Sequence, residues 1–183
     1  MTRLTKMPGF KGVIQDIGGP TANMFGFSCR NWQEQGACPD RNCRPDCPSL
    51  KTSQMQQVEL LRAVRAVAGV RHVFIGSGIR YDLVLADESG YLEEICGHHV
   101  SGHLKVAPEH ISPAVTACMN KPPGEVFERF RQEFEKIQEE KAGRARDGEK
   151  PIPAGKKPSR EYLLPDLMSD HPGCTVPDMS GLG

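Results

Sequence analysis

The chain has 183 residues, which is long enough for one domain with a hydrophobic core. It carries 23 basic and 23 acidic residues, and this balanced charge argues against a general attraction to nucleic acid or to an anionic membrane surface. No run approaches the roughly 20 apolar residues of a membrane helix, and residues 1–10 lack the apolar core of a signal peptide, so we expect a cytoplasmic protein.

The first half of the chain predicts two strands, one helix and a long loop. Residues 13–17 form a short apolar run that ends at a pair of glycines, as a buried strand followed by a turn does. Residues 21–53 show no periodicity and contain four cysteines and three prolines, so we expect a loop that is functional or held by a metal. Apolar residues at helical spacing predict a helix over 58–67, followed by a strand over 70–75.

The second half alternates between helices and strands. We expect a short helix over 91–96 closed by Gly97, a strand over 103–107 broken by Pro108, a short helix over 112–119, an amphipathic helix over 124–141 and a strand over 162–168. Residues 142–160 are charged and contain glycine and proline, which predicts a flexible linker. We expect residues 176–183 to be a disordered tail.

Strands that alternate with helices predict βα units and a parallel sheet, so the fold class is α/β. About four strands are visible, which is half the number in a closed eight-stranded barrel. We therefore expect residues 1–175 to form one incomplete parallel unit, with residues 21–53 as a cysteine-rich loop insertion. Parallel sheets bind ligands at the carboxyl ends of their strands, so the turns that follow the strands hold the candidate site residues.

The sharpest chemical signal is a cluster of cysteines. Four of the seven cysteines fall within nineteen residues: Cys29, Cys38, Cys43 and Cys47. Structural disulfides are rare in the cytosol, so this clustering favours a metal. Four thiolates suit either tetrahedral Zn²⁺ or an iron–sulfur cluster, and the spacing matches neither a zinc ribbon nor a ferredoxin motif. The alternative is four reduced cysteines without a metal.

Two turns after predicted strands contain further candidates. Gly18 and Gly19 leave room for a ligand to approach the backbone, although an ordinary strand-to-loop turn is the simpler explanation. Ser77 and Arg80 follow the strand at 70–75, where a guanidinium and a hydroxyl could hold a ligand carboxylate. A surface ion pair between Arg80 and its neighbour two residues on is equally compatible with the sequence.

Glu109 lies just beyond the strand at 103–107, where a barrel places residues that face a ligand. A metal site built from histidines is less favoured. The four histidines in this region do not share one helical face and form no HExxH motif, so we expect structural or loop roles for them. They are His98, His99, His103 and His110.

Several long strings of this sequence, in this order, resemble the YgiQ-type radical-SAM proteins. The strings are PGFKG from Pro8, DIGGPTANM from Asp16, the four-cysteine loop, SGIRYD from Ser77, HVSGHLKVAPEH from His99 and LMSDHPG from Leu167. The resemblance runs from about residue 7 to about residue 175 and is interrupted at 142–160. Uncommon strings in a matching order are more specific than any single motif.

The resemblance implies a partial TIM-like (βα) barrel of about four parallel strands that binds a [4Fe–4S] cluster and S-adenosylmethionine (SAM). In such enzymes the reduced cluster cleaves SAM to a 5′-deoxyadenosyl radical, which abstracts hydrogen from a substrate. By position, Gly18 and Gly19 would meet the amino and carboxylate end of SAM. Ser77, Arg80 and Glu109 would line the same mouth of the barrel. The resemblance does not imply a particular substrate.

The chain departs from this family at one essential motif. Radical-SAM enzymes hold their cluster through CxxxCxxC, and here Cys43 and Cys47 begin that spacing, but position 50 is Leu50. In the family the triad precedes the Pro-Gly-Phe string, so we expect it to lie before Met1 and this chain to be an internal fragment that is inactive alone. The cysteine loop resembles the family's second cysteine group and would hold zinc or a second iron–sulfur cluster. The alternative function is a metal-binding scaffold or binding module that uses the four cysteines and has no catalytic activity.

Overall fold

The computed structural model describes residues 3–19, 21–38, 43–146, 160–169 and 171–180. Within these ranges the chain is a mixed α/β protein with three two-stranded sheets, of which two are parallel. The described residues form no closed barrel. The helices and the two parallel strand pairs confirm the predicted α/β class.

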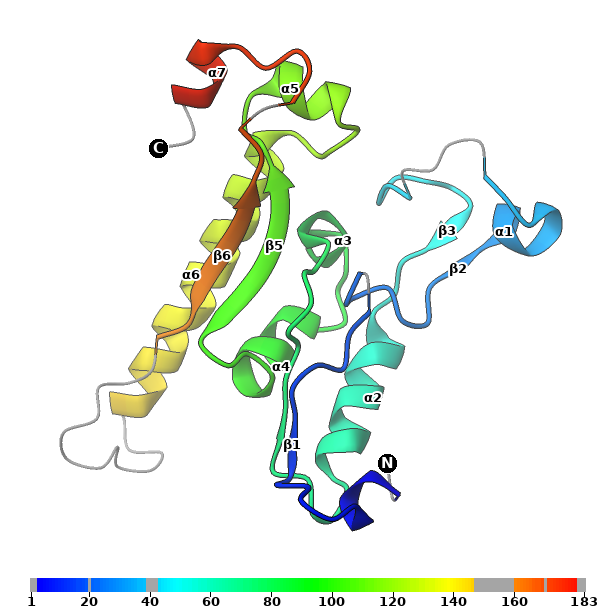
Figure 1. Cartoon of the computed structure of the whole chain (residues 1–183), viewed down its shortest axis with the longest axis vertical. Coiled ribbons are helices and arrows are strands. Elements are labelled where there is room, and N and C mark those ends of the chain that lie inside the picture. The colour runs from blue at the N-terminus through cyan, green and yellow to red at the C-terminus, as the bar shows by residue number, and fades with distance from the viewer. Residues whose placement is uncertain (1–2, 20, 39–42, 147–159, 170, 181–183) are drawn as a thin grey trace.

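Two parallel strand pairs provide the framework of the fold. β1 (Val13–Ile14) pairs with β4 (His72–Val73). β5 (His103–Glu109) pairs with β6 (Tyr162–Leu167), and Figure 1 shows these two longer strands side by side. Both pairings join segments that are more than fifty residues apart in the sequence, which is ample for the crossover connection that parallel strands need.

A backbone bridge connects the two pairs. Ile79, in the segment that follows β4, forms a parallel bridge with Val106 of β5. The N–H of Ile79 donates to the carbonyl of Lys105 at 3.0 Å. The four parallel segments therefore lie next to one another in chain order, which is the order that successive βα units produce.

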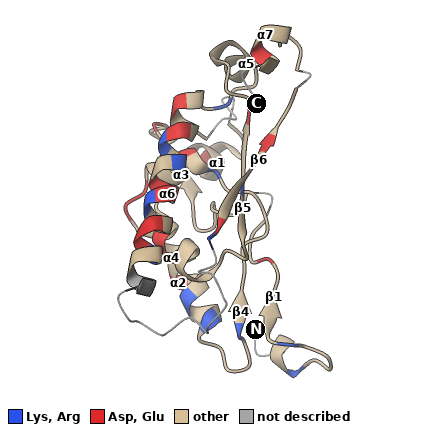
Figure 2. Cartoon of the chain, turned by 90° about the vertical axis from the view of Figure 1, so that its left-hand side faces the viewer, with Lys and Arg blue, Asp and Glu red and all other residues tan. Residues whose placement is uncertain are grey.

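Three helices cover one side of these strands, as Figure 2 shows. They are α2 (Met55–Arg65), α4 (Tyr91–His98) and α6 (Gly124–Arg146). Their apolar side chains share one core with the strands, in which Leu61, Ile95, Leu104 and Phe130 are fully buried. Buried and exposed residues alternate along β5, as expected for a strand that is covered on one face.

The cysteine-rich segment forms its own small substructure. β2 (Ser28–Cys29) and β3 (Leu50–Lys51) pair antiparallel at its base, and α1 (Arg30–Gln35) follows β2 directly. Figure 1 shows this segment projecting from the molecule on the side away from α6. The prediction of a loop without regular structure over 21–53 is therefore wrong in part, because elements of two to six residues are too short to show a periodicity.

The remaining helices are short. They are a 3₁₀ helix at Leu4–Lys6, α3 (Tyr81–Leu85), α5 (Pro113–Cys118) and α7 (Val176–Ser180). In the part of the chain that the structure describes, no helix is long and apolar enough to cross a membrane.

Two predicted element ends need correction. α4 continues through Gly97 to His98, because the last turn of a helix tolerates a glycine. β5 continues through Pro108 to Glu109. The pairing with β6 shifts register between Val106 and Glu109, and at such an irregularity a proline does not interrupt a regular hydrogen-bond ladder.

The predicted linker and tail also differ from the structure. α6 extends to Arg146, so the first residues of the predicted 142–160 linker are helical, while 147–159 lie outside the described residues. Val176–Ser180 forms α7 where we expected a disordered tail. The backbone N–H of Thr175 donates to Asp178 at 2.9 Å, and this side chain also accepts from the Thr175 hydroxyl. The bond from the Thr175 N–H to the side chain three residues further on is one half of a capping box, at the start of the helix.

Candidate functional site

Asp16 joins the two glycine-containing turns that follow β1 and β4. Its carboxylate accepts hydrogen bonds from the backbone N–H of Gly18 at 2.9 Å and of Gly76 at 3.1 Å. The hydroxyl of Ser77 donates to the second oxygen of the same carboxylate. The structure thus brings Gly18 and Ser77 together at the carboxyl ends of neighbouring parallel strands, where the sequence placed candidate ligand contacts.

The hydrogen bonds favour the ionised form of Asp16. Partial burial raises its pKa, but the bonds from the Ser77 hydroxyl and from the backbone N–H groups of Gly76, Gly18 and Ser77 lower it by more. The net result is a pKa below the ordinary value of 3.8. The carboxylate is nevertheless exposed to solvent, so it can still accept a hydrogen bond from a bound cation.

The two glycines of the first turn have different roles. A Cβ atom at Gly18 would lie 2.9 Å from the Cβ of Ala22 and 2.9 Å from Oδ1 of Asp16, so only glycine fits there without a shift of its neighbours. A Cβ atom at Gly19 would meet no atom within 4 Å. Gly18 therefore serves close packing of the turn, whereas the space beside Gly19 is open to a ligand.

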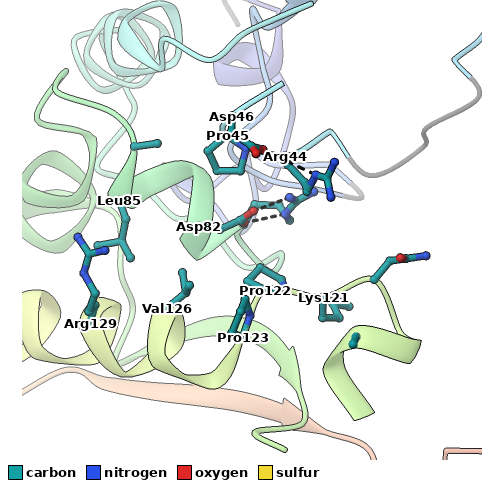
Figure 3. A pocket seen from close by; sticks show the side chains of 14 residues that line it. Arg44, Pro45, Asp46, Asp82, Leu85, Lys121, Pro122, Pro123, Val126 and Arg129 are labelled. Atoms are coloured by element: carbon teal, nitrogen blue, oxygen red, sulfur yellow. Dashed lines mark hydrogen bonds and ion pairs between the residues drawn. The ribbon is translucent and has the colours of Figure 1, made fainter. Parts of the chain in front are cut away.

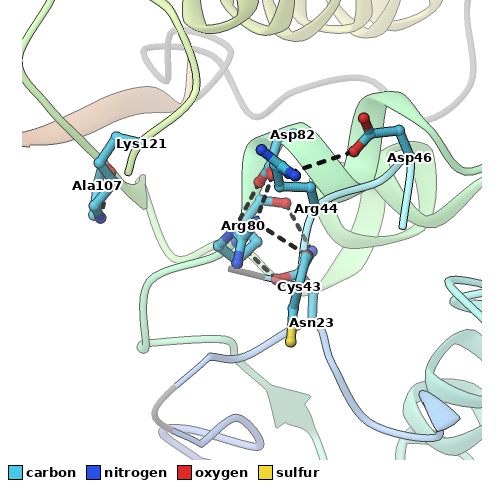
Figure 4. Close-up of polar contacts among 8 residues, drawn as sticks. All are labelled: Asn23, Cys43, Arg44, Asp46, Arg80, Asp82, Ala107 and Lys121. Carbon is cyan, nitrogen blue, oxygen red and sulfur yellow. Dashed lines mark hydrogen bonds and ion pairs between the residues drawn. The ribbon is translucent and has the colours of Figure 1, made fainter. Parts of the chain in front are cut away.

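Arg80 forms a bidentate ion pair with Asp82, as Figure 4 shows. The distances are 2.8 Å from Nε to Oδ1 and 2.6 Å from Nη2 to Oδ2. The Asp82 side chain is 4% exposed and that of Arg80 29% exposed, so this is not the surface pair considered from the sequence. The hydrogen bonds to Asp82 raise the pKa of Arg80, because they favour its charged form.

The same guanidinium supports the cysteine-rich segment. Nη2 of Arg80 donates to the backbone carbonyl of Cys43 at 3.4 Å. The backbone of Cys43 has a φ of 45°, a left-handed conformation that is uncommon for a residue with a side chain. Arg80 thus links the start of α3 to the cysteine segment, and this contact with Cys43 was not foreseen from the sequence.

Asn23 is a second anchor beside Arg80. It is fully buried, and its side-chain amide bonds both backbone groups of Arg80, as a neighbouring strand would. Nδ2 donates to the carbonyl of Arg80 at 2.9 Å, and Oδ1 accepts from the N–H of Arg80 at 2.7 Å. These two bonds attach the chain after the glycine turn to the SGIRYD string, which begins at Ser77.

The four thiols of the cysteine segment lie near one another. All four are half-buried: Cys29, Cys38, Cys43 and Cys47. The pKa of the Cys43 thiol is raised, first by burial and then by the proximity of the other three sulfurs, which outweighs the opposing charge of Arg80. Within the described residues, no three side chains of His, Cys, Asp or Glu are arranged as ligands of one metal ion.

Glu109 lies at the carboxyl end of β5 but already has a cationic partner. Nζ of Lys121 donates to Oε1 of Glu109 at 3.2 Å and to the carbonyl of Ala107 at 3.2 Å. The Glu109 carbonyl accepts from the N–H of Met168 at 2.7 Å, and its φ of 64° marks the irregular end of the strand. Among the described residues, no hydrogen bond or ion pair joins Glu109 to the turn at Gly18 and Ser77.

Two of the histidines have buried, structural positions. The ring of His99 is fully buried, with Nδ1 at 2.7 Å from the carbonyl of Val73. His110 is also fully buried, and its Nδ1 accepts a hydrogen bond from the N–H of Ser112 at 3.0 Å. These contacts agree with the structural roles expected from the sequence.

Curated proteins named UPF0313 protein are similar to this chain over nearly its whole length. The identity is 47% over 179 residues to one from Methanosarcina acetivorans, 42% over 178 residues to one from Clostridium perfringens and 38% over 179 residues to one from Pseudomonas syringae pv. tomato. These matches cover 97%, 96% and 97% of this chain.

The relatives are much longer than the chain. The same three matches cover 22%, 24% and 21% of the relatives, so the chain spans less than a quarter of their length. No protein-family profile matches the chain, and no solved structure matches it. The chain is therefore a homologue of one segment of the UPF0313 proteins.

Proposed function

We propose that this chain is a segment of a radical-SAM iron–sulfur enzyme and that its glycine turns contribute to the SAM site. The observation that carries the proposal is the position of Asp16. Its carboxylate holds the turns at Gly18 and Ser77 together at the ends of two neighbouring parallel strands. Both turns belong to the sequence strings that resemble the radical-SAM family.

The arrangement of the strands supports a partial (βα) barrel. The segments at β1, β4, β5 and β6 follow one another in chain order and run parallel. Figure 2 shows helices on one side of these strands. On β5, exposed His103 and Lys105 alternate with buried residues, so they belong to the opposite side. In a barrel this second side would face the interior, where the cofactor and substrate bind.

The turn residues suit the amino group of SAM. The space beside Gly19 is open, and the neighbouring carboxylate of Asp16 is exposed and ionised, so it can accept hydrogen bonds from an ammonium group. When bound, SAM and a reduced [4Fe–4S] cluster would supply the radical that starts the reaction. The contribution of this chain's residues is to bind and orient SAM.

The other two candidate contacts have competing partners. Arg80 is paired with Asp82 and bonded to Cys43, so in our proposal it supports the cysteine segment more than it binds SAM. Glu109 would have to exchange Lys121 for a ligand. The chain contains no CxxxCxxC motif, so we do not expect SAM cleavage by this segment alone.

The proposal is tested by the DNA that precedes the coding sequence. We expect it to encode a CxxxCxxC segment in frame or after a single frameshift. A region that encodes no such segment in any frame would rule the proposal out. In a protein that contains both segments, Gly19→Val should weaken SAM binding at least tenfold by filling the open space beside the turn. Gly143→Val, which is also in open space but on α6, is the matched control and should leave SAM binding unchanged.

A second function is supported by the clustering of the four cysteines in the sequence and by the proximity of the other three to Cys43. We propose that the cysteine segment binds one metal centre, either Zn²⁺ or an iron–sulfur cluster, because clustered thiolates are the ligands that these metals prefer. Metal binding would replace the thiol protons and so overcome the raised pKa of Cys43. A scaffold or binding module without catalysis would need only this site.

Metal analysis of the purified chain separates these cases. We expect one equivalent of zinc in a colourless protein, or iron with sulfide and visible charge-transfer absorption after anaerobic preparation. Cys43→Ser together with Cys47→Ser should abolish metal retention, whereas Cys118→Ser, at an exposed cysteine outside the segment, should retain it. Metal content that survives the double substitution would disprove the assignment.

A further inference from the structure

A pocket of about 600 Å³ lies between the cysteine-rich segment and α6. Figure 3 shows it bounded by the segment around Pro45, by α3 near Leu85, by the residues that precede α6 and by α6 itself at Val126. Sites for small molecules typically have volumes of about 300–1,000 Å³. The pocket is therefore of a size that accommodates a small organic compound.

The walls of the pocket are mostly apolar. Pro122 and Pro123 form one wall together with Val126, and Leu85 stands opposite them. Two small apolar side chains, Ala86 and Ala117, also line the pocket. Rigid prolines and aliphatic side chains of this kind suit the apolar body of a ligand.

The pocket also carries an excess of positive charge. Four cationic and two anionic side chains line it: Arg44, Arg80, Lys121 and Arg129, with Asp46 and Asp82. Asp82 is buried and satisfied by Arg80, so it does not repel an anion strongly. Asp46 is 82% exposed and lies 3.7 Å from Arg44, which makes it a weak surface pair.

Arg129 differs from the other three cations. Its side chain forms no ion pair within the described residues, whereas the other three have carboxylate partners there. It is exposed on α6, one turn after Val126, and so stands at the edge of the apolar wall. A guanidinium without a carboxylate partner beside an apolar surface is suited to pair with an anionic group of a ligand.

We propose that this pocket binds a small organic anion, in which a carboxylate, sulfonate or phosphate group pairs with Arg129 and an apolar body lies against Leu85, Val126 and the two prolines. The site does not include Gly19 or the Asp16 turn. The inference therefore goes beyond the proposed SAM site and does not rest on it.

The probe for the test is 1-anilinonaphthalene-8-sulfonate, an aromatic sulfonate whose fluorescence rises in an apolar site. We expect saturable binding to the wild-type chain with one site. Arg129→Gln should raise the dissociation constant about tenfold, the size expected for the loss of one charge-assisted hydrogen bond. Lys136→Gln, at an exposed cation on α6 outside the pocket, is the matched control and should have less than a twofold effect.

A neutral probe and a space-filling variant locate the binding. N-phenyl-1-naphthylamine has the same rings without the sulfonate, so its affinity should be unchanged by Arg129→Gln. Ala117→Trp should fill the pocket and weaken both probes. Binding that is not saturable, an unchanged sulfonate affinity in Arg129→Gln, or an equal loss of both probes in that variant would overturn the proposal. Tight binding of either probe to Ala117→Trp with unchanged circular dichroism would also overturn it.

Discussion

The Arg80 guanidinium connects a buried carboxylate, Asp82, to the backbone of the cysteine-rich segment. The two ion-pair bonds are 2.8 and 2.6 Å, and a further bond of the guanidinium reaches the carbonyl of Cys43 at 3.4 Å. Asp82 orients the guanidinium that bonds to Cys43. Asp82 therefore influences the position of Cys43 through Arg80, without a direct hydrogen bond to it. This relationship ties the cysteine segment to the strand ends that carry the candidate SAM contacts.

Removal of the Asp82 charge should loosen that connection. We expect Asp82→Asn to lower the free energy of unfolding by about 1–2 kcal/mol, because a half-buried guanidinium loses its carboxylate partner. The reaction of Cys43 with a thiol reagent should become faster, since its carbonyl loses an oriented donor. Urea unfolding and thiol labelling measure the two effects. Asp46→Asn, in the exposed pair with Arg44, is the control and should change stability by less than about 0.5 kcal/mol. Equal effects of the two substitutions would contradict the role assigned to Asp82.

Asp16 should make stability depend on pH in the acidic range. Its pKa in the folded chain is lower than the ordinary 3.8, so the unfolded chain takes up a proton first as the pH falls. The stabilisation is therefore fully present above about pH 4 to 5 and is lost as the pH falls through the folded pKa. Asp16→Asn should cost about 1 kcal/mol at pH 6 and progressively less below pH 4.

Chemical unfolding of both proteins between pH 3 and pH 7 measures this difference. Asp166→Asn, at an exposed residue of β6, serves as the control for a general loss of charge. A stability difference between wild type and Asp16→Asn that is as large at pH 3 as at pH 6 would show that the carboxylate is not stabilised by its hydrogen bonds.

The long elements were predictable from the sequence, as were the short elements β1, β4 and α5, but several other short elements were not. The helix predicted at 124–141 and the strand predicted at 103–107 are present as parts of α6 and β5. They could be predicted because apolar residues that recur at a regular spacing indicate the buried face of a helix or strand. β2, α1 and α3 were missed. They contain between two and six residues, and their positions depend on contacts with the rest of the chain more than on local pattern.

The candidate site was predictable only in outline. Glycines and small polar residues after strands pointed to the turns at Gly18 and Ser77, which the structure brings together. The role of Asp16 was missed because its partner Gly76 is sixty residues away, and only the pairing of β1 with β4 brings them together. Arg80 and Asp82 were recognisable as a pair, but the burial of Asp82 depends on tertiary packing that the two residues alone do not reveal.

A polar cluster at the start of β6 should be important for stability. Glu161 accepts hydrogen bonds from Nε2 of Gln138 at 2.9 Å and from Nζ of Lys141 at 2.9 Å, and Lys141 also donates to the carbonyl of Cys96 at 2.5 Å. We expect Glu161→Ala to cost about 2–3 kcal/mol, because it leaves buried Gln138 without its acceptor and Lys141 without its counter-charge. Urea unfolding gives the value. Glu139→Ala, at an exposed position of α6, should cost less than about 0.5 kcal/mol, and a similar cost at both positions would refute the prediction.

The proposed metal centre and the proposed anion pocket should be coupled, because they share a stretch of chain. Arg44, Pro45 and Asp46 line the pocket and lie between two of the proposed metal ligands, Cys43 and Cys47. Metal binding to both thiolates would hold these three residues in one conformation. Binding of the sulfonate would then no longer have to include the entropy cost of ordering them. We therefore expect the metal-loaded chain to bind the aromatic sulfonate about three- to tenfold more tightly than the chelator-treated chain.

Linkage supplies the internal check on that coupling. If the metal raises the affinity for the sulfonate by some factor, the sulfonate must raise the affinity for the metal by the same factor. Fluorescence titrations with and without metal, and zinc competition with and without sulfonate, measure the two sides. The variant with Cys43→Ser and Cys47→Ser should bind the sulfonate equally with and without metal. Equal sulfonate affinity of the metal-loaded and metal-free wild-type chains would show that the pocket wall at residues 44–46 is held by contacts such as the Arg80 bond to Cys43, and that the two sites act independently.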